Sequence, residues 1–278
     1  MNIVIVGLGL IGGSYAKSIS RYTEHKVYTI SHNNESISRA LNDNAIVGTI
    51  TNDELCNMDM VIVSLPPAKA IEFMVDNIPK MKEGAILTDI CGVKKVVSDK
   101  VKNISTKYRV NYISVHPMAG RECTGYVNSL PTLFQNRSLI IIDNESADSQ
   151  KVALVEGLHR AIGFSTIVHT TPSNHDRIIA YTSQMCHITS NAFVKSMTSR
   201  EHNGYSGGSF EDLTRVAFLD PKVWVELFSM NRDNLLSELR VYIKELKRYE
   251  EALDSENYES LRNLLQEGRD IKESITVK

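Results

Sequence analysis

The glycine-rich segment at residues 7–12, Gly-Leu-Gly-Leu-Ile-Gly, constrains this chain more than any other feature of its sequence. It follows the apolar run 3–6 directly, it precedes a stretch with helical spacing, and a second β-branched run comes at residues 26–30. A strand, a G-x-G-x-x-G turn and a helix in this order form the dinucleotide-binding unit of a Rossmann-type fold. An ordinary strand, turn and helix with incidental glycines is the alternative. We therefore expect a nicotinamide dinucleotide site within the first fifty residues.

The glycines of this loop have separate predicted roles. Gly7 is expected to make the tight turn, Gly9 to let backbone N–H groups approach a pyrophosphate, and Gly12 to let the helix and the strand pack closely. The N-terminus of the following helix carries partial positive charge, which favours binding of the phosphates.

The other predicted cofactor contacts lie at the ends of two later strands. The full predicted set is Gly7, Gly9, Leu10, Ile11, Gly12, Ser31, His32, Ser64 and Pro66. Where an NAD-preferring site has an acidic residue after its second strand, this chain has Ser31-His32-Asn33. Ser31 and His32 are candidate donors to the 2′-phosphate of NADP, and the alternative is that Asn33 or Asn34 binds the ribose of NAD. The sequence leaves NAD and NADP open, with a slight preference for NADP.

The first 170 residues alternate between short β-branched runs and helical patterns. Strands are predicted at 3–6, 26–30, 60–64, 85–88, 111–115, 138–142 and 165–169, and helices at 14–21, 34–44, 68–80, 93–104 and 149–162. Near-continuous apolar runs are typical of strands that are covered on both faces. This part therefore predicts an α/β domain with a doubly wound parallel sheet and right-handed crossovers.

The pattern changes after Pro172, where strand signals end. Helices are predicted at 175–197, 210–217, 221–250 and 258–272, with one glycine-containing loop at 200–209. We expect two domains, a dinucleotide-binding domain at 1–170 and an all-α domain for substrate binding and dimerisation at 171–278.

Composition and charge exclude several classes of function. The 278 residues carry a net charge of -2, without the basic excess that nucleic acid or acidic membranes attract. No apolar run approaches the roughly eighteen residues of a membrane helix. The four cysteines are far apart, with no CxxC pair and no His/Cys cluster at zinc spacing. We expect a cytoplasmic protein with a small-molecule substrate, no metal, no nucleic acid and no membrane partner.

His116 is the first candidate catalytic residue. It follows the predicted strand 111–115, and ligands of open parallel sheets lie at the carboxyl ends of the strands. An imidazole with a pKa of about 6.5 can take a hydroxyl proton while hydride leaves the same carbon. A structural histidine is the alternative on position alone.

Residue combinations favour the catalytic interpretation, because the chain resembles the prephenate dehydrogenase family, which includes the arogenate dehydrogenases. The matching pieces are residues 7–14, Thr88-Asp89-Ile90, 116–120 (His-Pro-Met-Ala-Gly) with Glu122 and Gly125, Leu133-Phe134, His175-Asp176, Ser183, His187, 210–217 (Phe-Glu-Asp-Leu-Thr-Arg-Val-Ala), Asp220-Pro221 and Trp224. The glycine loop is common to many dehydrogenases, whereas the blocks at 116–120 and 210–217 are far more specific.

The resemblance implies an oxidative decarboxylation of prephenate to 4-hydroxyphenylpyruvate in tyrosine synthesis. In such a site His116 would be the base, Arg215 would bind a substrate carboxylate, and His187 would complete the pocket. Further residues are expected to bind substrate or gate Arg215: Glu122, Ser183, Gln184, Gly208, Asp212 and Trp224. For His187 and Trp224 the alternative is that both fill a helical core.

Three departures from the family pattern affect this expectation. Cys91-Gly92 stands where relatives usually have Gly-Ser, so a serine that would assist the histidine is missing. Gln184 replaces a histidine, and Glu211 replaces an arginine. One cation fewer and one carboxylate more would favour arogenate, which carries a cationic amino group, over prephenate. The alternative is that Glu211 faces solvent or a partner subunit.

The resemblance also implies a homodimer whose helical domains interlock. The chain ends within a predicted charged helix at 267–278, so we expect no appended regulatory domain, and any tyrosine inhibition would act at the active site. Two other functions are open. One is a dehydrogenase of the β-hydroxyacid type, with Lys195 as the candidate base. The other is a non-catalytic protein that senses dinucleotides.

Overall fold

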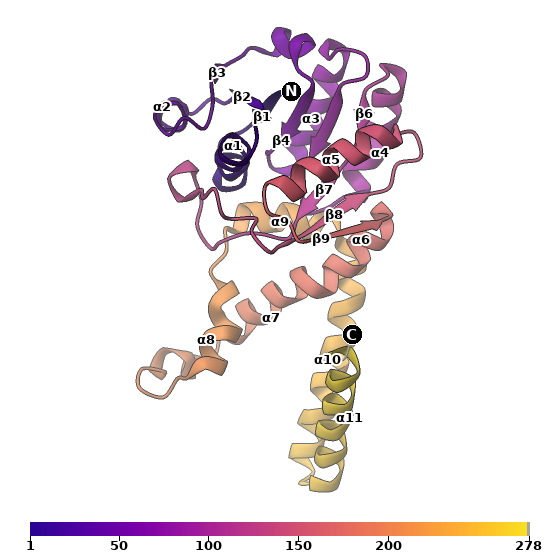
Figure 1. The fold of residues 1–278 in the computed structure, drawn as a ribbon. Helices are drawn as coiled ribbons and strands as arrows, with labels where there is room; N and C mark the ends of the chain where they lie inside the picture. Colours follow the sequence, from indigo (N-terminus) through magenta and orange to yellow (C-terminus); the bar gives the residue numbers. More distant parts are fainter. Residues whose placement is uncertain (277–278) are drawn as a thin grey trace.

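The computed structural model describes residues 1–276, which form an α/β part followed by a helical part (Figure 1). The α/β part contains a six-stranded parallel sheet with the order β3-β2-β1-β4-β5-β6. Its strands are β1 (Asn2–Val6), β2 (Lys26–Ile30), β3 (Gly48–Thr49), β4 (Met60–Val63), β5 (Ile86–Asp89) and β6 (Asn111–Tyr112). The predicted fold class, a Rossmann-type parallel sheet followed by helices, is confirmed.

Helices cover both faces of this sheet. They are α1 (Leu10–Tyr22), α2 (Asn34–Asn42), α3 (Pro67–Asn77), α4 (Lys95–Lys107) and α5 (Ser149–Ala161). Side chains of a strand alternate between its faces, so Ile3 and Ile5 of β1 join a core with α1, α2 and α5. Val4 and Val6 join the opposite core with α3 and α4. This double burial explains why the sequence of β1 is continuously apolar.

A second, three-stranded sheet lies beside the first. It consists of β7 (Val115–Pro117), β8 (Ser138–Ile142) and β9 (Thr166–Thr170), in the order β7-β8-β9. Strands β7 and β8 are antiparallel, and β8 and β9 are parallel. The prediction that these segments extend the parallel sheet was therefore wrong, and the predicted strand 111–115 is two short strands in different sheets.

A buried polar cluster lies at this change of sheet. The hydroxyls of Tyr112 and Ser114 both donate to Asp89 Oδ2, at 2.7 and 2.6 Å. Lys94 Nζ donates to Asp89 Oδ1 at 2.8 Å and to the carbonyl of Val115 at 2.6 Å. These bonds hold the backbone between β6 and β7, where the chain passes from the first sheet to the second.

The helical part begins directly after β9. Its α-helices are α6 (Pro172–Ile179), α7 (Cys186–Phe193), α8 (Gly208–Thr214), α9 (Pro221–Met230), α10 (Arg232–Asp254) and α11 (Tyr258–Thr276), and Ala180–Met185 between α6 and α7 is π-helical. Short 3-10 turns of the chain are Asn52–Asn57, Ile78–Lys80, Tyr126–Asn128, Met197–Glu201 and Arg215–Ala217. Two helices predicted as continuous, at 175–197 and 221–250, are therefore interrupted.

The second interruption has a clear cause at Asn231. This residue is buried, and its Nδ2 donates to the carbonyl of Asp176 at 2.8 Å and to Gln184 Oε1 at 2.9 Å. Its backbone leaves helical geometry, with φ -116° and ψ 24°. The side chain thus joins α6 and the π-helical segment to the corner between α9 and α10.

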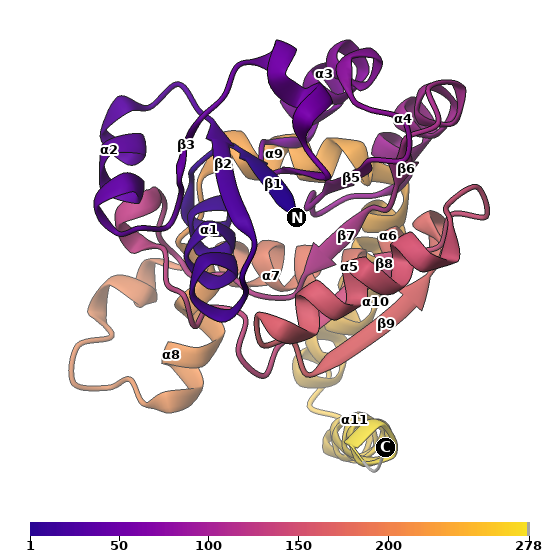
Figure 2. The same cartoon turned by 45° about the horizontal axis from the view of Figure 1, so that its top comes forward.

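Helix α9 returns to the α/β part, while α10 and α11 form a hairpin that points away from it (Figures 1 and 2). Leu227 and Met230 of α9 pack against the core that α3 and α4 share. Glu226 Oε1 accepts a hydrogen bond from the backbone N–H of Ala68 in α3, at 2.6 Å. No helix within residues 1–276 has both the length and the apolar character needed to cross a membrane.

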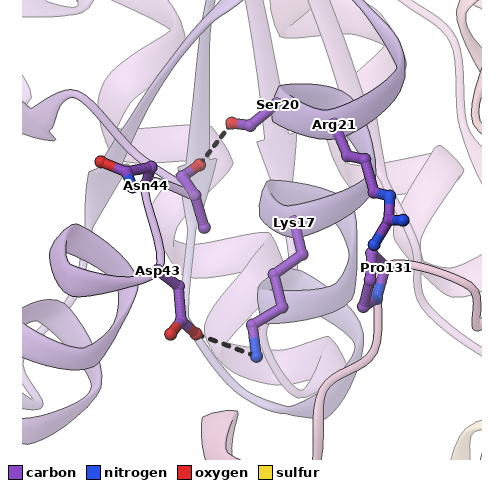
Figure 3. A pocket seen from close by; sticks show the side chains of 7 residues that line it. Lys17, Ser20, Arg21, Asp43, Asn44 and Pro131 are labelled. Atoms are coloured by element: carbon purple, nitrogen blue, oxygen red, sulfur yellow. Dashed lines mark hydrogen bonds and ion pairs between the residues drawn. The ribbon is translucent and has the colours of Figure 1, made fainter.

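Polar contacts fix the helix that follows the glycine loop (Figure 3). Lys17 of α1 pairs with Asp43 at 3.1 Å, and Ser20 Oγ donates to the carbonyl of Ala45 at 2.7 Å. Lys17 Nζ also donates to the carbonyl of Ser129 at 3.2 Å. Because α1 is held from two sides, its N-terminus keeps a fixed direction relative to β1.

Candidate active site

The glycine loop has the geometry that a dinucleotide requires. Gly7 has φ +93°, and its N–H donates to the carbonyl of Ile30 at 2.9 Å. A Cβ at Gly12 would lie 2.0 Å from the oxygen of Gly7, so only glycine fits there. Nothing lies within 4 Å of a Cβ built at Gly9, and this side of the loop is open for a ligand.

The start of α1 supplies the electrostatic part of this cradle. Gly9 is the N-cap residue, and no side chain caps the helix. The N–H groups of the first turn therefore lack a side-chain partner and point towards the open side of the loop, as phosphate binding requires. Ser64, after β4, packs against Gly7 and Gly12. These residues fit the pyrophosphate of a nicotinamide dinucleotide.

The segment after β2 contains the predicted specificity residues. Asn33 Oδ1 accepts from the N–H of Ser36 at 2.9 Å and so caps α2. Ser31 Oγ accepts from the N–H of Asn33 at 3.3 Å, and His32 is exposed. No carboxylate occupies residues 31–33, so nothing in this short segment repels a 2′-phosphate.

His116, in β7, lies where the two parts of the molecule meet. Its Nδ1 is 2.9 Å from Nε2 of His175 in α6, and Nδ1 of His175 is 2.7 Å from Asp176 Oδ1. The two carboxylate oxygens of Asp176 accept from the backbone N–H groups of Lys94 and Lys95, at 2.8 and 2.9 Å. The imidazole of His116 is therefore held by a chain of bonds that crosses from one part to the other.

The surroundings of His116 keep its imidazole neutral. Burial lowers the pKa of His116 well below its usual value, and the nearby His175 and Lys94 lower it further, against an opposing contribution from Asp89. Burial would raise the pKa of Asp89, but Lys94, Ser114 and Tyr112 outweigh that effect, and the pKa is lowered. At neutral pH His116 can thus accept a proton, as a general base must.

Gly92 lies beside this imidazole. A Cβ at this position would be 3.9 Å from His116 Nε2 and 3.5 Å from Leu227 Cδ2, which are ordinary contact distances. A serine would fit here with its hydroxyl near Nε2, so its absence from this chain removes a direct partner of the ring.

His187, Trp224 and Arg215 form the wall contributed by the helical part. The ring of His187 lies 3.7 Å from that of Trp224, and its Nδ1 donates to the carbonyl of Val216 at 2.9 Å. Arg215, the neighbour of Val216, pairs with Glu122 Oε1 from the loop after His116. Burial lowers the pKa of His187, Arg215 lowers it as well, and Val216 and Glu122 act in the opposite direction.

A continuous chain of contacts joins these two groups of residues. His116 faces Gly92, Gly92 faces Leu227, and Leu227 lies one helical turn after Trp224 on α9. Trp224 contacts His187, and His187 bonds the carbonyl of Val216, which is next to Arg215. Arg215 in turn pairs with Glu122, which follows His116 by six residues. His116 and Arg215 are thus linked by contacts that involve both parts of the chain.

The remaining predicted substrate residues lie at different places. Asp212 in α8 and Gly208 at its start are exposed, and Asp212 and Arg215 line one hollow with α10. Ser183 and Gln184 are in the π-helical segment. Gln184 is buried. Its Oε1 accepts a hydrogen bond from Asn231, and its Nε2 donates to the carbonyl of Leu227 at 3.4 Å, so its amide connects the π-helical segment to α9 and the corner after it.

Two residues on which alternatives depended are exposed. Lys195, the candidate base of a β-hydroxyacid dehydrogenase, lies beyond the end of α7. Glu211, in α8, also faces outward. Neither side chain has a contact that joins it to His116 in the described residues 1–276.

Sequence reasoning did not assign a site role to His175, Asp176, Lys94 or Leu227. The pair His175-Asp176 counted only as a matching piece of the family. The available signal was a histidine and a carboxylate in the first turns of the helix after the last predicted strand. Their relation to His116 requires the change of sheet at residues 113–115, which no local pattern predicts.

The fold and this site together define a nicotinamide-dependent dehydrogenase. A family model described as the nucleotide-binding domain of prephenate dehydrogenase matches residues 15–168, and a model of the dimerization domain of prephenate dehydrogenase matches residues 171–267. The chain belongs to the prephenate dehydrogenase family.

Individual relatives agree with this assignment. The chain is 27% identical to the cyclohexadienyl dehydrogenase of Zymomonas mobilis over 265 residues, which cover 92% of this chain and 89% of that protein. A structure of prephenate dehydrogenase from Aquifex aeolicus, in complex with hydroxyphenyl propionate and NAD+, superposes with a TM-score of 0.87 at 29% identity, covering 99% of this chain and 98% of that one. Arogenate dehydrogenase of Synechocystis has the same fold, with a TM-score of 0.83, 22% identity and coverage of 99% and 100%.

Proposed function

We propose that this dehydrogenase oxidises and decarboxylates prephenate, giving 4-hydroxyphenylpyruvate and carbon dioxide. The observation that carries the proposal is the series of contacts that links His116 of the α/β part to Arg215 of the helical part. The relatives described above are named a cyclohexadienyl dehydrogenase, a prephenate dehydrogenase and an arogenate dehydrogenase. The test is a steady-state assay of the purified protein with prephenate and with arogenate, each with NAD+ and NADP+. Absorbance at 340 nm should rise with prephenate, and no rise with any combination would contradict catalysis and favour a dinucleotide sensor.

The mechanism follows from the positions of the side chains. His116 takes the proton of the ring hydroxyl while hydride leaves the carbon that bears it. The bound nicotinamide supplies the hydride acceptor. The bond to the ring carboxylate breaks, its electron pair completes the aromatic ring, and carbon dioxide leaves. The proton on His116 then returns to the phenolate oxygen or passes to solvent.

Arg215 is the proposed anchor for a substrate carboxylate. Its guanidinium can form two parallel bonds to a carboxylate, and in this structure it pairs with the carboxylate of Glu122. About 61% of the Arg215 side chain is exposed, so substrate can reach it. Glu122 would release Arg215 when substrate binds, and His187 and Trp224 would provide the apolar wall for the ring.

Arogenate is the second candidate substrate. Gln184 supplies no cation, and its amide is committed to Asn231, so the helical part offers one positive group fewer to a dianion. Glu211 is exposed, which supports the alternative that it does not contact substrate within one chain. The ratio of kcat/KM values in the same assay decides between prephenate and arogenate.

We propose that the site accepts NADP+ as well as NAD+, with NADP+ preferred. The support is the segment Ser31-His32-Asn33, which has two side chains able to donate to a 2′-phosphate and no acid. Ser31→Asp should lower kcat/KM for NADP+ and leave that for NAD+ within a few-fold. An equal effect on both cofactors would contradict the assignment.

A second copy of this chain is the proposed partner. Apolar side chains of α10 are exposed, including Val241 at 55% and Leu246 at 49%, and Val241 lines a hollow with Met185 and Val216. Such patches on a helix seldom remain uncovered. Light scattering should give twice the mass of the monomer, and Val241→Glu should lower it. Lys100→Glu, on the exposed side of α4, is the matched control and should leave the mass unchanged.

A further inference from the structure

The bond between His116 and His175 constrains where their hydrogens lie. Two neutral imidazoles joined at 2.9 Å share one hydrogen, so one ring nitrogen donates and the other accepts. His175 is 1% exposed, and Asp176 is 2% exposed, so water does not compete for these bonds. The direction of the shared bond therefore depends on the other nitrogen of His175.

Asp176 determines that direction. Its Oδ1 lies 2.7 Å from His175 Nδ1 and can only accept, so Nδ1 of His175 carries the hydrogen. Burial lowers the pKa of His175, against an opposing effect of the bond to Asp176, so the ring is neutral at pH 7 and its Nε2 is an acceptor. His116 must then donate from Nδ1, which leaves the lone pair of His116 on Nε2.

The free nitrogen of His116 faces the proposed site. Nε2 is the atom of His116 that lies nearest to a Cβ built at Gly92, at 3.9 Å, and within residues 1–276 only Nδ1 of the two ring nitrogens of His116 has a hydrogen-bond partner. Since this chain has no serine at position 92, no hydroxyl there orients the ring. The bond from α6 is what holds it.

The charged groups around the pair come from every neighbouring element. Lys94 and Asp89 form a buried ion pair beside β7, and Lys94 bonds the carbonyl of Val115, next to His116 in the chain. Asp176 is anchored by backbone N–H groups at the start of α4. Lys94 and Asp176, the charged neighbours of the two histidines, are thus held in place by backbone groups. The ring of His175 cannot turn without breaking its bond to Asp176.

We propose that His175 is a positioning residue, held by Asp176, that fixes the tautomer of His116 and presents Nε2 as the acceptor for the hydroxyl proton of the substrate. This inference rests on the proposed function of His116 as the base. When His116 takes a proton, its Nδ1–H continues to donate to His175, and the negative charge of Asp176 lies beyond. A histidine of the helical part thereby determines which ring nitrogen of His116, a residue of the α/β part, carries the hydrogen.

The direct test is nitrogen NMR of the unaltered protein labelled with 15N-histidine. The signals of His116 are assigned by their loss in His116→Gln. We expect His116 to carry its hydrogen on Nδ1 at pH 7, both free and with NADH bound. A hydrogen on Nε2 would overturn the proposal, whatever the activity of the protein.

Two variants test the consequence for turnover. His175→Leu removes the acceptor and should lower kcat by about 100-fold or more, the range in which base catalysis is lost. KM and the Kd for NADH should change less than about three-fold. His175→Gln offers an amide oxygen near the position of Nε2 and should recover at least about a tenth of the activity. Normal turnover in a folded His175→Leu would overturn the proposal.

Failure of this inference is distinguishable from failure of the proposed function. If the unaltered protein oxidises neither prephenate nor arogenate, the proposed function is wrong, but the NMR result still reports the tautomer. If the unaltered protein is active and both His175 variants unfold, the tautomer measured in the unaltered protein decides.

Discussion

The α/β part and the helical part of this chain are stabilised in different ways. The first buries two apolar clusters on opposite faces of its sheet. In α10 and α11, by contrast, only Leu235, Ala252 and Leu264 are buried, and several large apolar side chains face outward. The comparison shows that the α/β part has its own core, whereas α10 and α11 bury few side chains, and α10 contacts α6, α9 and the π-helical segment. The proposed chemistry is placed where the two parts meet.

The largest expected effect is at the base that β7 supplies. His116→Asn should lower kcat by about two to four orders of magnitude, the usual contribution of a general base. Binding of NADH, which depends on the glycine loop, should stay within about two-fold, as measured by fluorescence titration. Unchanged turnover in this variant would remove His116 from the mechanism.

The next effect tests the contribution of the helical part to the same site. Arg215→Ala should lower kcat/KM for prephenate by about 10- to 100-fold, because a charge-assisted pair to a carboxylate is lost. Most of the change should appear in KM. Arg160→Ala, an exposed arginine of α5, is the control and should leave both constants unchanged. Equal losses in both variants would mean that Arg215 has no special role.

The third prediction is that the stability of the α/β part depends on pH, because a buried histidine lies in its core. His159 is buried between Tyr15 and the carbonyl of Val155, and burial lowers its pKa to about 4, although the bond to Val155 opposes the shift. The unfolded state binds a proton on His159 at higher pH than the folded state does. The contribution of the neutral His159 to the free energy of unfolding is therefore complete above pH 6.5 and is lost as pH decreases towards 4. The loss should be about 3 kcal/mol.

Urea unfolding at pH 7, 5 and 4 measures that change. His159→Gln keeps a polar side chain but cannot titrate, so its stability should depend less on pH over this range. The same slope in both proteins would show that other groups cause the acid sensitivity.

The smallest effects compare one glycine from each part. Gly12→Ala should lower the free energy of unfolding by about 1–3 kcal/mol, since its Cβ would meet the oxygen of Gly7. Gly268→Ala lies in α11 with open space around it and should raise stability by about 0.5–1 kcal/mol. Thermal unfolding of both variants gives the two signs, and equal signs would contradict the comparison.

The sequence predicted the elements whose signals are local. The continuous apolar runs identified β1, β2 and β4, and the glycine loop indicated α1, although this helix begins at Leu10 and not at residue 14 as predicted. Strand β3, only Gly48–Thr49, was too short to give a pattern. The change of sheet after β6 was missed because it depends on a carboxylate and an ammonium group from elsewhere in the chain, Asp89 and Lys94.

The candidate site shows the same limit. His116, Arg215 and Glu122 were predicted from motifs, and their residue types alone suggest chemistry. The position of His175 against His116 was not predictable, because 59 residues separate them and the contact depends on how α6 meets β7. The corner at Asn231 was missed for a similar reason, since its cause is a pair of bonds to α6 and the π-helical segment.

The π-helical segment Ala180–Met185 has a consequence for the length of the chain. It separates His175 on α6 from His187 on α7, and a wider turn changes the angle at which the later residues leave the helix axis. In an α-helix one residue corresponds to about 100° of rotation. A π-helical turn holds about one residue more than an α-helical turn, so deleting one residue within this segment would leave an ordinary α-helical turn and keep His187 close to its present direction. The number of residues between 176 and 187 is thus matched to a helix with one widened turn.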